Sequence, residues 1–543
     1  MKQFITSLLF STLLFSGFSQ CSETSKTKIL LMGDSWAFFM NVDGTINKVA
    51  KDWGHSDVEY YTNLILSENG AETDDFLKPS KVSELAGKLA SMPDLKVVHL
   101  SIAGNDFLGS WDVSFTPAKV DSLYNGVAGR LDSIIAQINQ IRPDVQVFWS
   151  GYTYTNFGEV IGSLPSFLQS SHPFYSRWQA MGFPTFTQIN TVQNWFQEKI
   201  RVRYASNSKV TYIPAASILQ YTYGQTANLA VPPSGTYPAF TATIPEGHVD
   251  YPSPRNSMRD YLLTKDCFHL SVKGYYDFIS YHFQKFYQKH LMEDDYTIAD
   301  FSKSGSVSNS GTISNELKIG KDGSDEYVGI IHLDNNHLEA NVPESLSLFI
   351  KIDTVYNTNF LTSGEFELDI IQGNFGGNES LDTQDYFSTS GITGTTCVFG
   401  TNEVGKWVRF DLPASFLDHI RKSKSQIRIR YTGATDGIVK FVNTANDDFQ
   451  PVLEVKYGAS YLGLSNQNST NKLDIYPNPT KDILKIVSNE SIENISIYTV
   501  SGQLMLNEVN PSNAINVSNL PVGMYIINVQ IGNQIQQQKF IKQ

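Results

Sequence analysis

Apolar and polar residues follow two different rhythms in the two halves of this chain. From about residue 27 to 292, short apolar runs alternate with stretches in which an apolar residue returns at every third or fourth position. The runs predict buried strands and the longer spacing predicts amphipathic helices. Strands that alternate with helices predict a parallel sheet with helices on both faces. The expected strands are Lys28–Met32, Val97–Ile102, Val145–Trp149 and Val210–Ile213, and the expected helices are Ala37–Asp52, Val120–Ile141 and Val272–His290.

One segment interrupts this rhythm. Residues 152–195 are rich in Ser, Pro, Gly and aromatic residues, and they are too many for a connecting loop. We interpret them as an insertion, and we hypothesise that it covers the active site. Its aromatic side chains have three alternative functions: they stack on sugars, they line a tunnel for an acyl chain, or they bury the insertion itself. These are Tyr152, Tyr154, Phe157, Phe167, Phe174, Tyr175 and Trp178.

Beyond residue 302 the pattern changes to a strict alternation of apolar and polar positions, broken by Gly, Asn and Asp. This pattern is typical of half-buried strands joined by tight turns. It predicts a β-sandwich module at 302–457, a polar linker at 458–471 and a smaller sandwich at 472–543. The Ser- and Gly-rich stretch Lys303–Ser314 is expected to be a linker as well. The expected architecture is therefore an α/β domain followed by two all-β sandwich domains.

The first 19 residues have the composition of a secretory signal peptide. Met1-Lys2 is positively charged, the stretch from Phe4 to Phe15 is mostly apolar, and small residues precede a cleavage site before Gln20. The apolar stretch is shorter than the ~20 residues of a membrane-spanning helix. No transmembrane segment is therefore expected anywhere in the chain. A lipid anchor on Cys21 is an alternative to simple cleavage.

The charge balance argues against a nucleic-acid partner. The 41 Lys and Arg residues face 54 Asp and Glu residues, which gives a formal charge of −13, and the basic residues do not cluster. The chain is therefore not expected to offer a basic surface to the phosphate backbone of a nucleic acid. Of the three cysteines, Cys267 and Cys397 lie in different predicted domains, so no structural disulfide is expected.

Three short polar blocks carry the candidate chemistry. Gly33-Asp34-Ser35 and Gly104-Asn105-Asp106 each follow an apolar run, and Asp266-Cys267-Phe268-His269 precedes the last helical stretch of the α/β region. Active-site groups of an open α/β sheet lie outside the carboxyl ends of its strands, where these blocks are expected. A serine, an amide, a histidine and a carboxylate are groups that a serine hydrolase uses.

Each block also has a purely structural interpretation. Asp34 or Ser35 fits a helix N-cap, and Gly-Asn-Asp fits an ordinary turn. Asp266 fits a helix cap, and together with His269 it would supply two ligands of a metal site. No third histidine stands at a suitable spacing and no HExxH motif is present, so no metal ion is expected. Taken one by one, the blocks leave these alternatives open.

In their order and spacing the three blocks resemble those of the SGNH, or GDSL-type, hydrolase family. The resemblance covers about residues 27–292 and implies a flavodoxin-like three-layer α/β/α fold. It implies that Ser35 is the nucleophile, that His269 is the general base and that Asp266 orients the histidine. Chemistry of this kind requires no cofactor.

The same resemblance implies an oxyanion hole. Its donors would be the backbone N–H groups of Ser35 and Gly70 and the side-chain amide of Asn105. The first block departs from the family pattern because Trp36 stands where the family has leucine. Its position beside the nucleophile predicts that Trp36 contributes to substrate binding.

The first β module resembles the DNRLRE-type modules that accompany secreted polysaccharide enzymes. The resemblance lies mainly in the arginine-bearing strand Val408–Leu412 and the closing strand Pro451–Val455. Carbohydrate binding and a passive spacer are both open roles, because a fold-level analogy does not assign function.

The last domain resembles a type IX secretion sorting domain. The resemblance is carried by Pro477-Asn478-Pro479, by Leu520-Pro521-Val522-Gly523 before Met524-Tyr525, and by the lysine-bearing end. It implies export across the outer membrane by the type IX machinery, to the cell surface or the medium.

Together these resemblances imply a secreted serine esterase. Its expected substrates are acyl or acetyl esters, with acylated polysaccharide as the favoured class, cleaved through an acyl-enzyme. A lipid-directed esterase and a catalytically inactive carbohydrate-binding surface protein are the alternatives.

Overall fold

The computed structural model describes most of the chain after residue 24. The predicted signal peptide and Cys21 lie outside the described residues. Within the described part, no helix combines the length and apolarity needed to cross a bilayer. The chain divides into two compact units, one ending at Gly458 and the other beginning at Ala459. The described residues are 25–223, 248–262, 264–338, 343–359, 361, 365–389, 392–397, 403–420, 423–458, 474–487, 492–499, 503–509, 511–531 and 534–543.

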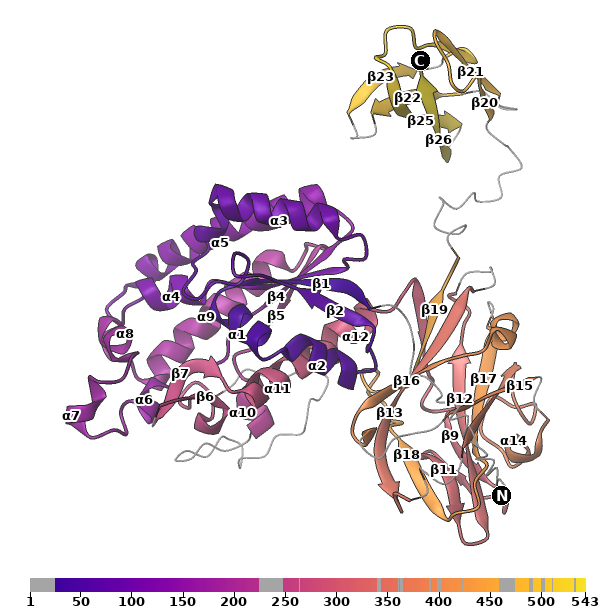
Figure 1. Cartoon of the computed structure of the whole chain (residues 1–543), viewed down its shortest axis with the longest axis horizontal. Helices are drawn as coiled ribbons and strands as arrows, with labels where there is room; N and C mark the ends of the chain where they lie inside the picture. The colour runs from indigo at the N-terminus through magenta and orange to yellow at the C-terminus, as the bar shows by residue number, and fades with distance from the viewer. Residues whose placement is uncertain are drawn as a thin grey trace, which may run out of the picture. The chain divides into compact units, whose positions relative to one another are not determined.

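A parallel sheet of five strands lies at the centre of the α/β region, in the order β2-β1-β3-β4-β5 (Figure 1). Four of these strands were expected from the sequence. The short strand β2 was not, because only its first residue is buried and no apolar run marks it. The bounds are β1 Lys26–Gly33, β2 Val58–Tyr61, β3 Val97–Ser101, β4 Gln146–Ser150 and β5 Val210–Ile213.

Alternate side chains of the strands enter two separate hydrophobic cores. In β1, Leu30 and Met32 pack with helices α3, α5 and α9, whereas Ile29 and Leu31 pack with α1, α2 and α11. Figure 1 shows α3 and α5 on one side of the sheet and α2 and α11 on the other. Both faces are thus covered, which is why the strands are continuously apolar. The bounds are α1 Ser35–Val42, α2 Thr45–Asp52, α3 Pro79–Ser91, α4 Gly104–Ser110, α5 Pro117–Ile141, α9 Phe186–Tyr204, α10 Ile218–Tyr223 and α11 Val272–His282.

Two of the expected helices are interrupted. The stretch Ala37–Asp52 forms two helices, because the chain turns at Gly44 with a φ of 60°, a left-handed conformation that glycine adopts without strain. The stretch Val272–His290 forms α11, a π turn η3 (Phe283–Tyr287) and a short α12 (Gln288–His290). Helical periodicity alone therefore predicted where these helical segments begin and end, but not where they are interrupted.

The segment 152–195 forms three short helices joined by loops, and its last ten residues are the first half of α9. Its first loop contacts an antiparallel hairpin, since the Asn156 N–H donates to the Cys267 carbonyl at 2.7 Å. The His172 Nε2 donates to the Lys265 carbonyl at 3.0 Å. The segment thus packs against the strand that carries the third polar block. The bounds are α6 Phe157–Val160, α7 Ser166–Gln169, α8 Tyr175–Ala180, β6 Met258–Tyr261 and β7 Thr264–Leu270, and short 3-10 helices lie at Asp75–Leu77 and Arg255–Ser257.

The region after Asp294 forms an antiparallel assembly of twelve hydrogen-bonded strands. The expected linker Lys303–Ser314 is wrong, because β9 and β10 lie within it and β9 pairs with β12. Its small polar side chains hid two short strands. A 3-10 helix lies at Ala414–His419. The bounds are β8 Asp295–Ile298, β9 Gly305–Ser308, β10 Ile313–Ser314, β11 Leu317–Asp322, β12 Asp325–Asp334, β13 Ser345–Tyr356, β14 Phe366–Gln372, α14 Gln384–Phe387, β15 Ile392–Cys397, β16 Trp407–Asp411, β17 Lys424–Tyr431, β18 Gly437–Phe441 and β19 Val452–Lys456.

This β region packs directly against the α/β region. The rings of Trp53 and Trp407 stack with their centroids 5.6 Å apart. The Arg409 guanidinium lies 3.2 Å from the buried Asp57 carboxylate. Trp407 and Phe349 belong to the same buried cluster as α1, α2 and α11. The two regions therefore share a hydrophobic core.

The second unit consists of two small antiparallel sheets, β20-β21-β24 and β23-β22-β25-β26. One core, which includes Leu484, Ile497, Ile527 and Phe540, lies between them. The bounds are β20 Asp474–Tyr476, β21 Ile483–Val487, β22 Asn494–Thr499, β23 Leu504–Val509, β24 Ala514–Asn516, β25 Gly523–Ile531 and β26 Gln534–Lys542.

Candidate active site

Ser35 is the first residue of α1, directly after the end of β1. Gly33 approaches β3 so closely that a β-carbon there would lie 1.8 Å from the Ser101 carbonyl oxygen, so only glycine fits. The Asp34 N–H donates to that carbonyl at 2.9 Å. The Asp34 carboxylate accepts the Trp36 N–H at 2.9 Å and thereby caps the helix. The capping function thus belongs to Asp34, and the Ser35 hydroxyl bonds elsewhere.

Ser35, His269 and Asp266 form a continuous hydrogen-bonded chain. His269 Nε2 lies 2.7 Å from Ser35 Oγ, and His269 Nδ1 lies 2.8 Å from Asp266 Oδ2. Because an ionised carboxylate only accepts hydrogen bonds, Nδ1 carries the proton and Nε2 accepts the serine hydroxyl. All three side chains are buried. The arrangement is the one in which an imidazole can take a proton from a serine.

The local backbone explains the spacing of Asp266 and His269. The second carboxylate oxygen, Oδ1, accepts the N–H groups of Phe268 and His269 at 2.9 and 2.8 Å. One carboxylate therefore holds both the backbone turn and the imidazole. The pair lies within β7, and α11 is capped instead by Ser271, whose hydroxyl accepts the Gly274 N–H at 3.0 Å.

Asn105 lies in the first turn of α4, after the end of β3. Its Nδ2 donates to the Ala71 carbonyl at 3.1 Å. The adjacent Asp106 is buried and accepts the Thr73 N–H at 2.9 Å and the Thr73 hydroxyl at 2.6 Å. Arg130 pairs with the same carboxylate at 2.7 Å. Asn105 and Asp106 thus fix the loop that contains Gly70.

Gly70 has a φ of 79°, in the left-handed region that favours glycine. Its loop runs beside the end of β1, since the Gly33 N–H donates to the Leu66 carbonyl at 2.8 Å and the Glu68 N–H donates to the Gly33 carbonyl at 3.1 Å. The structure therefore brings this loop to the same edge of the sheet as Ser35 and Asn105. The function of Gly70 as an oxyanion donor stays a prediction.

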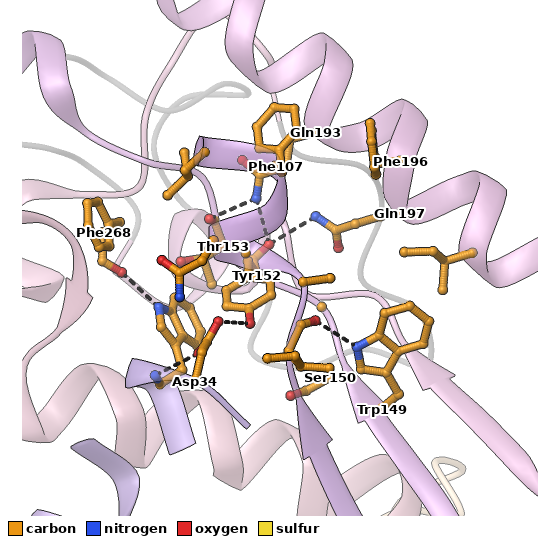
Figure 2. Close-up of a pocket in the computed structure, with 18 of the residues that line it drawn as sticks. Asp34, Phe107, Trp149, Ser150, Tyr152, Thr153, Gln193, Phe196, Gln197 and Phe268 are labelled. Atoms are coloured by element: carbon orange, nitrogen blue, oxygen red, sulfur yellow. Dashed lines mark hydrogen bonds between the residues drawn. The ribbon is translucent and has the colours of Figure 1, made fainter. Parts of the chain in front are cut away.

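A cavity of about 70 Å³ is lined by Ser35, Asn105 and residues of α4, α9, β4 and β5. Figure 2 shows Phe107, Trp149, Gln193 and Phe196 around it. We call it the nucleophile cavity, after the role expected of Ser35. Trp36 borders it, but the Trp36 ring is buried and meets Tyr152 and Tyr275 edge-on at 4.9 and 5.4 Å. Trp36 Nε1 donates to the Phe268 carbonyl at 3.1 Å. Much of its surface therefore serves packing, and its contact with substrate stays a prediction.

Tyr152 connects Asp34, the neighbour of Ser35, to the insertion. Its hydroxyl donates to Asp34 Oδ2 at 2.6 Å, and its carbonyl accepts the side-chain amides of Gln193 and Gln197, each at 2.9 Å (Figure 2). Complete burial raises the pKa of Asp34 to about 7, although the hydrogen bond from Tyr152 acts in the opposite direction. The carboxyl group beside the nucleophile is therefore held in an apolar surrounding.

Sequence reasoning did not assign Asp34, Gln193 or Gln197 to the site. Asp34 was read only as a cap, and its bond to Tyr152 joins positions 118 residues apart. The two glutamines stand four residues apart on the buried face of α9, between apolar residues such as Ile189 and Phe196. Polar residues at buried helical positions were the available signal.

Comparisons with solved structures give distant likenesses. A phospholipase A1 from Streptomyces albidoflavus is 17% identical, with 47% of this chain and 97% of that chain covered and a TM-score of 0.27. A carbohydrate esterase family 3 protein from Talaromyces cellulolyticus is 12% identical, with 49% and 98% covered and a TM-score of 0.25. An extracellular lipase from Streptomyces rimosus is 15% identical, with 47% and 97% covered and a TM-score of 0.24. Likeness at this level does not assign an activity.

The C-terminal region gives a sequence match. No curated protein sequence matches the chain. Residues 474–543 match the family described as the secretion system C-terminal sorting domain. These residues are therefore a type IX secretion sorting domain, which directs the protein to the cell surface or the medium.

Proposed function

We propose that residues 27–292 are an SGNH-type serine hydrolase, with the flavodoxin-like three-layer α/β/α fold of that family, that cleaves acyl esters outside the cell. The observation that carries this proposal is the chain Asp266–His269–Ser35, with distances of 2.8 and 2.7 Å. A helix cap or a turn does not require these three side chains to meet. A serine nucleophile requires this arrangement.

In the proposed reaction, Ser35 Oγ attacks the ester carbonyl carbon while its proton passes to His269 Nε2. The carbon–oxygen bond to the alcohol then breaks, and the leaving alkoxide takes the proton from His269. A water molecule next attacks the acyl-serine, giving its proton to Nε2, and the Ser35 oxygen leaves and takes that proton back. Asp266 keeps the imidazole in the tautomer that both halves need.

The tetrahedral intermediate of each half carries a negative oxygen. We assign its stabilisation to the Ser35 N–H at the start of α1, the Asn105 amide and the Gly70 N–H. Asn105 and Ser35 border the same cavity, which supports this assignment. Donors held in place before the reaction lower the barrier without a cost of reorganisation.

Export supports an extracellular ester as the substrate, and acylated polysaccharide is the class that we propose. The β region at 302–457 would then be an accessory module of the DNRLRE-like type, with carbohydrate binding as its hypothetical role. Its shared core with the α/β region supports a second role as a rigid support. A long-chain lipid ester is the competing substrate class.

Labelling by a fluorophosphonate, which reacts with activated serines, tests the proposal. The wild-type protein should be labelled and should release para-nitrophenol from para-nitrophenyl acetate. Ser35→Ala should lose both. Ser133→Ala is the matched control, because Ser133 is exposed on α5 and its hydroxyl bonds only to the Gly129 carbonyl. Undiminished hydrolysis by Ser35→Ala would refute the mechanism.

A further inference from the structure

The inner part of the nucleophile cavity is apolar along most of its wall. Phe107 of α4, Trp149 of β4, and Phe196 and Ile200 of α9 line it. All four are buried members of one hydrophobic core. The cavity therefore leads from the nucleophile into the interior of the domain and not along its surface.

The volume of the cavity limits what can enter it. A buried water occupies roughly 10–15 Å³ of such space, so about 70 Å³ accepts a chain of roughly five or six non-hydrogen atoms. A short acyl group fits this space. A long fatty acyl chain and a sugar ring are both too large for it.

The same wall contains polar atoms whose hydrogen-bonding capacity is unused. Thr153 Oγ1, Thr155 Oγ1, Gln193 Oε1 and Tyr212 Oη are buried and have no hydrogen-bond partner among the described residues. All four residues line the cavity. A buried polar atom without a partner destabilises the fold, because it has lost its hydrogen bonds to water without gaining others. A molecule inside the cavity is the natural partner for these atoms.

Gln193 shows how this unused capacity is oriented. Its Nε2 donates to the carbonyls of Tyr152 and Thr153, both at 2.9 Å (Figure 2). These bonds turn the amide nitrogen towards the loop backbone, so that Oε1 is directed away from that loop. Gln197, one helical turn further on, uses both ends: Nε2 donates to Tyr152 and Oε1 accepts the Ala215 N–H at 3.2 Å. Of these two glutamines, Gln193 is thus the one whose side-chain oxygen has no partner among the described residues.

The hydroxyl of Tyr212 is available as a donor. Burial raises the pKa of Tyr212 well above its ordinary value, so the hydroxyl keeps its proton in the physiological range. Donors (Tyr212, Thr153 and Thr155) and an acceptor (Gln193) are thus present together. A hydroxyl group both donates and accepts, and so it matches this set better than a carbonyl or a hydrocarbon does.

We propose that the nucleophile cavity is the acyl subsite and that it selects a short acyl chain bearing a hydroxyl group. The proposal rests on the serine hydrolase function proposed above. The apolar wall takes the carbon chain, and the hydroxyl group supplies a partner to the unpaired polar atoms of the wall. An unsubstituted chain of the same length covers these atoms without bonding to them, which lowers its affinity.

The test compares para-nitrophenyl esters of acetate, butyrate, β-hydroxybutyrate and octanoate on the full chain. We expect kcat/KM to be at least about tenfold higher for β-hydroxybutyrate than for butyrate, a difference of about 1.4 kcal/mol. We expect octanoate to be at least about tenfold poorer than butyrate, because it exceeds the cavity volume.

Variants identify the atoms responsible. Thr155→Val and Tyr212→Phe each remove one hydroxyl at nearly constant volume, and each should lower the ratio of β-hydroxybutyrate to butyrate hydrolysis towards one. Thr211→Val is the matched control: Thr211 neighbours Tyr212 but points to the opposite face of β5, where it accepts Gln146 Nε2 at 3.1 Å. It should keep the wild-type ratio.

The failure of this proposal is distinguishable from failure of the hydrolase assignment. Suppose that Ser35 is labelled and the acetate ester is hydrolysed, but kcat/KM is the same for butyrate as for β-hydroxybutyrate, or the same for octanoate as for butyrate. The subsite proposal is then refuted and the hydrolase assignment stands. If wild-type protein is neither labelled nor active on any of the four esters, the hydrolase assignment fails and the subsite proposal fails with it.

Discussion

Replacing Asp34 with asparagine is expected to remove a pH-dependent component of thermal stability. Burial raises the pKa of Asp34 to about 7 in the folded protein, from an ordinary value of 3.8. Between these two pH values the folded state holds a proton that the unfolded state has released. Asp34 therefore makes its full contribution to the free energy of unfolding below about pH 4. This contribution is lost as the pH rises through about 7.

The magnitude follows from the size of the pKa difference. About 3 pKa units at about 1.4 kcal/mol each give about 4 kcal/mol over the whole window. Of this, about 3 kcal/mol falls between about pH 4.5 and pH 8. For a compact unit of this size, 1 kcal/mol moves Tm by about 1–2 °C, so about 3–6 °C is expected. Asparagine still accepts the Trp36 N–H but does not titrate.

The assay is scanning calorimetry of the wild type and of Asp34→Asn across this pH range. The effects of groups that titrate in both proteins cancel when the two Tm values are subtracted. As the pH rises, the Tm of the wild type should fall by about 3–6 °C relative to that of the variant. Asp144→Asn is the control: Arg142 lowers the pKa of the exposed Asp144, so its effect lies below about pH 4 and has the opposite sign. A difference that is flat, or that grows in favour of the wild type with rising pH, would refute the reasoning.

Four further changes test other parts of the structure. Asp266→Asn should place an amide N–H against His269 Nδ1, favour the wrong imidazole tautomer and lower kcat by about 10⁴, as steady-state kinetics on acetate esters would measure. Asn105→Ala should lower kcat on acetate esters by about 10²–10³ and also slow fluorophosphonate labelling, while the protein stays folded, since it removes one proposed oxyanion donor. Trp407→Ala should destabilise the first unit by about 3–5 kcal/mol, seen as a lower Tm, because it opens the core shared by the two regions. Tyr152→Phe should move the pH midpoint of the Asp34 effect upwards, because the lost hydrogen bond lowers the Asp34 pKa in the wild type.

The strands and the three polar blocks were predictable because their signals are local. A continuous apolar run such as Val97–Ile102 marks a strand buried on both faces, and β3 occupies nearly the same residues. The first two blocks follow from the same logic, since each stands where an apolar run ends, whereas the third lies within β7. Their meeting was an inference from parallel topology, and the distance of 2.7 Å between Ser35 and His269 now joins residues 234 positions apart.

The missed features depend on contacts that local patterns do not encode. β2 is partly exposed and lacks an apolar run, so its place at the edge of the sheet comes only from pairing with β1. β9 and β10 are short and rich in small polar residues; β9 is a strand because it pairs with β12, and β10 is a strand because it pairs with β9. The nucleophile cavity is lined by residues from six separate elements, namely α1, α4, β4, α9, β5 and β7, and from the loops between them. No window of sequence contains that information.

The structure explains why the first two polar blocks each begin with glycine. At Gly33 a β-carbon would collide with the Ser101 carbonyl, and at Gly104 it would lie 2.8 Å from Cζ of Tyr152. The first approach brings the end of β1 against β3 and sets the position of Ser35. The second lets the Tyr152 ring lie flush against α4, so that its hydroxyl reaches Asp34. Each glycine thus fixes where a neighbouring element stands, and the positions of Ser35 and of the Tyr152 hydroxyl depend on them.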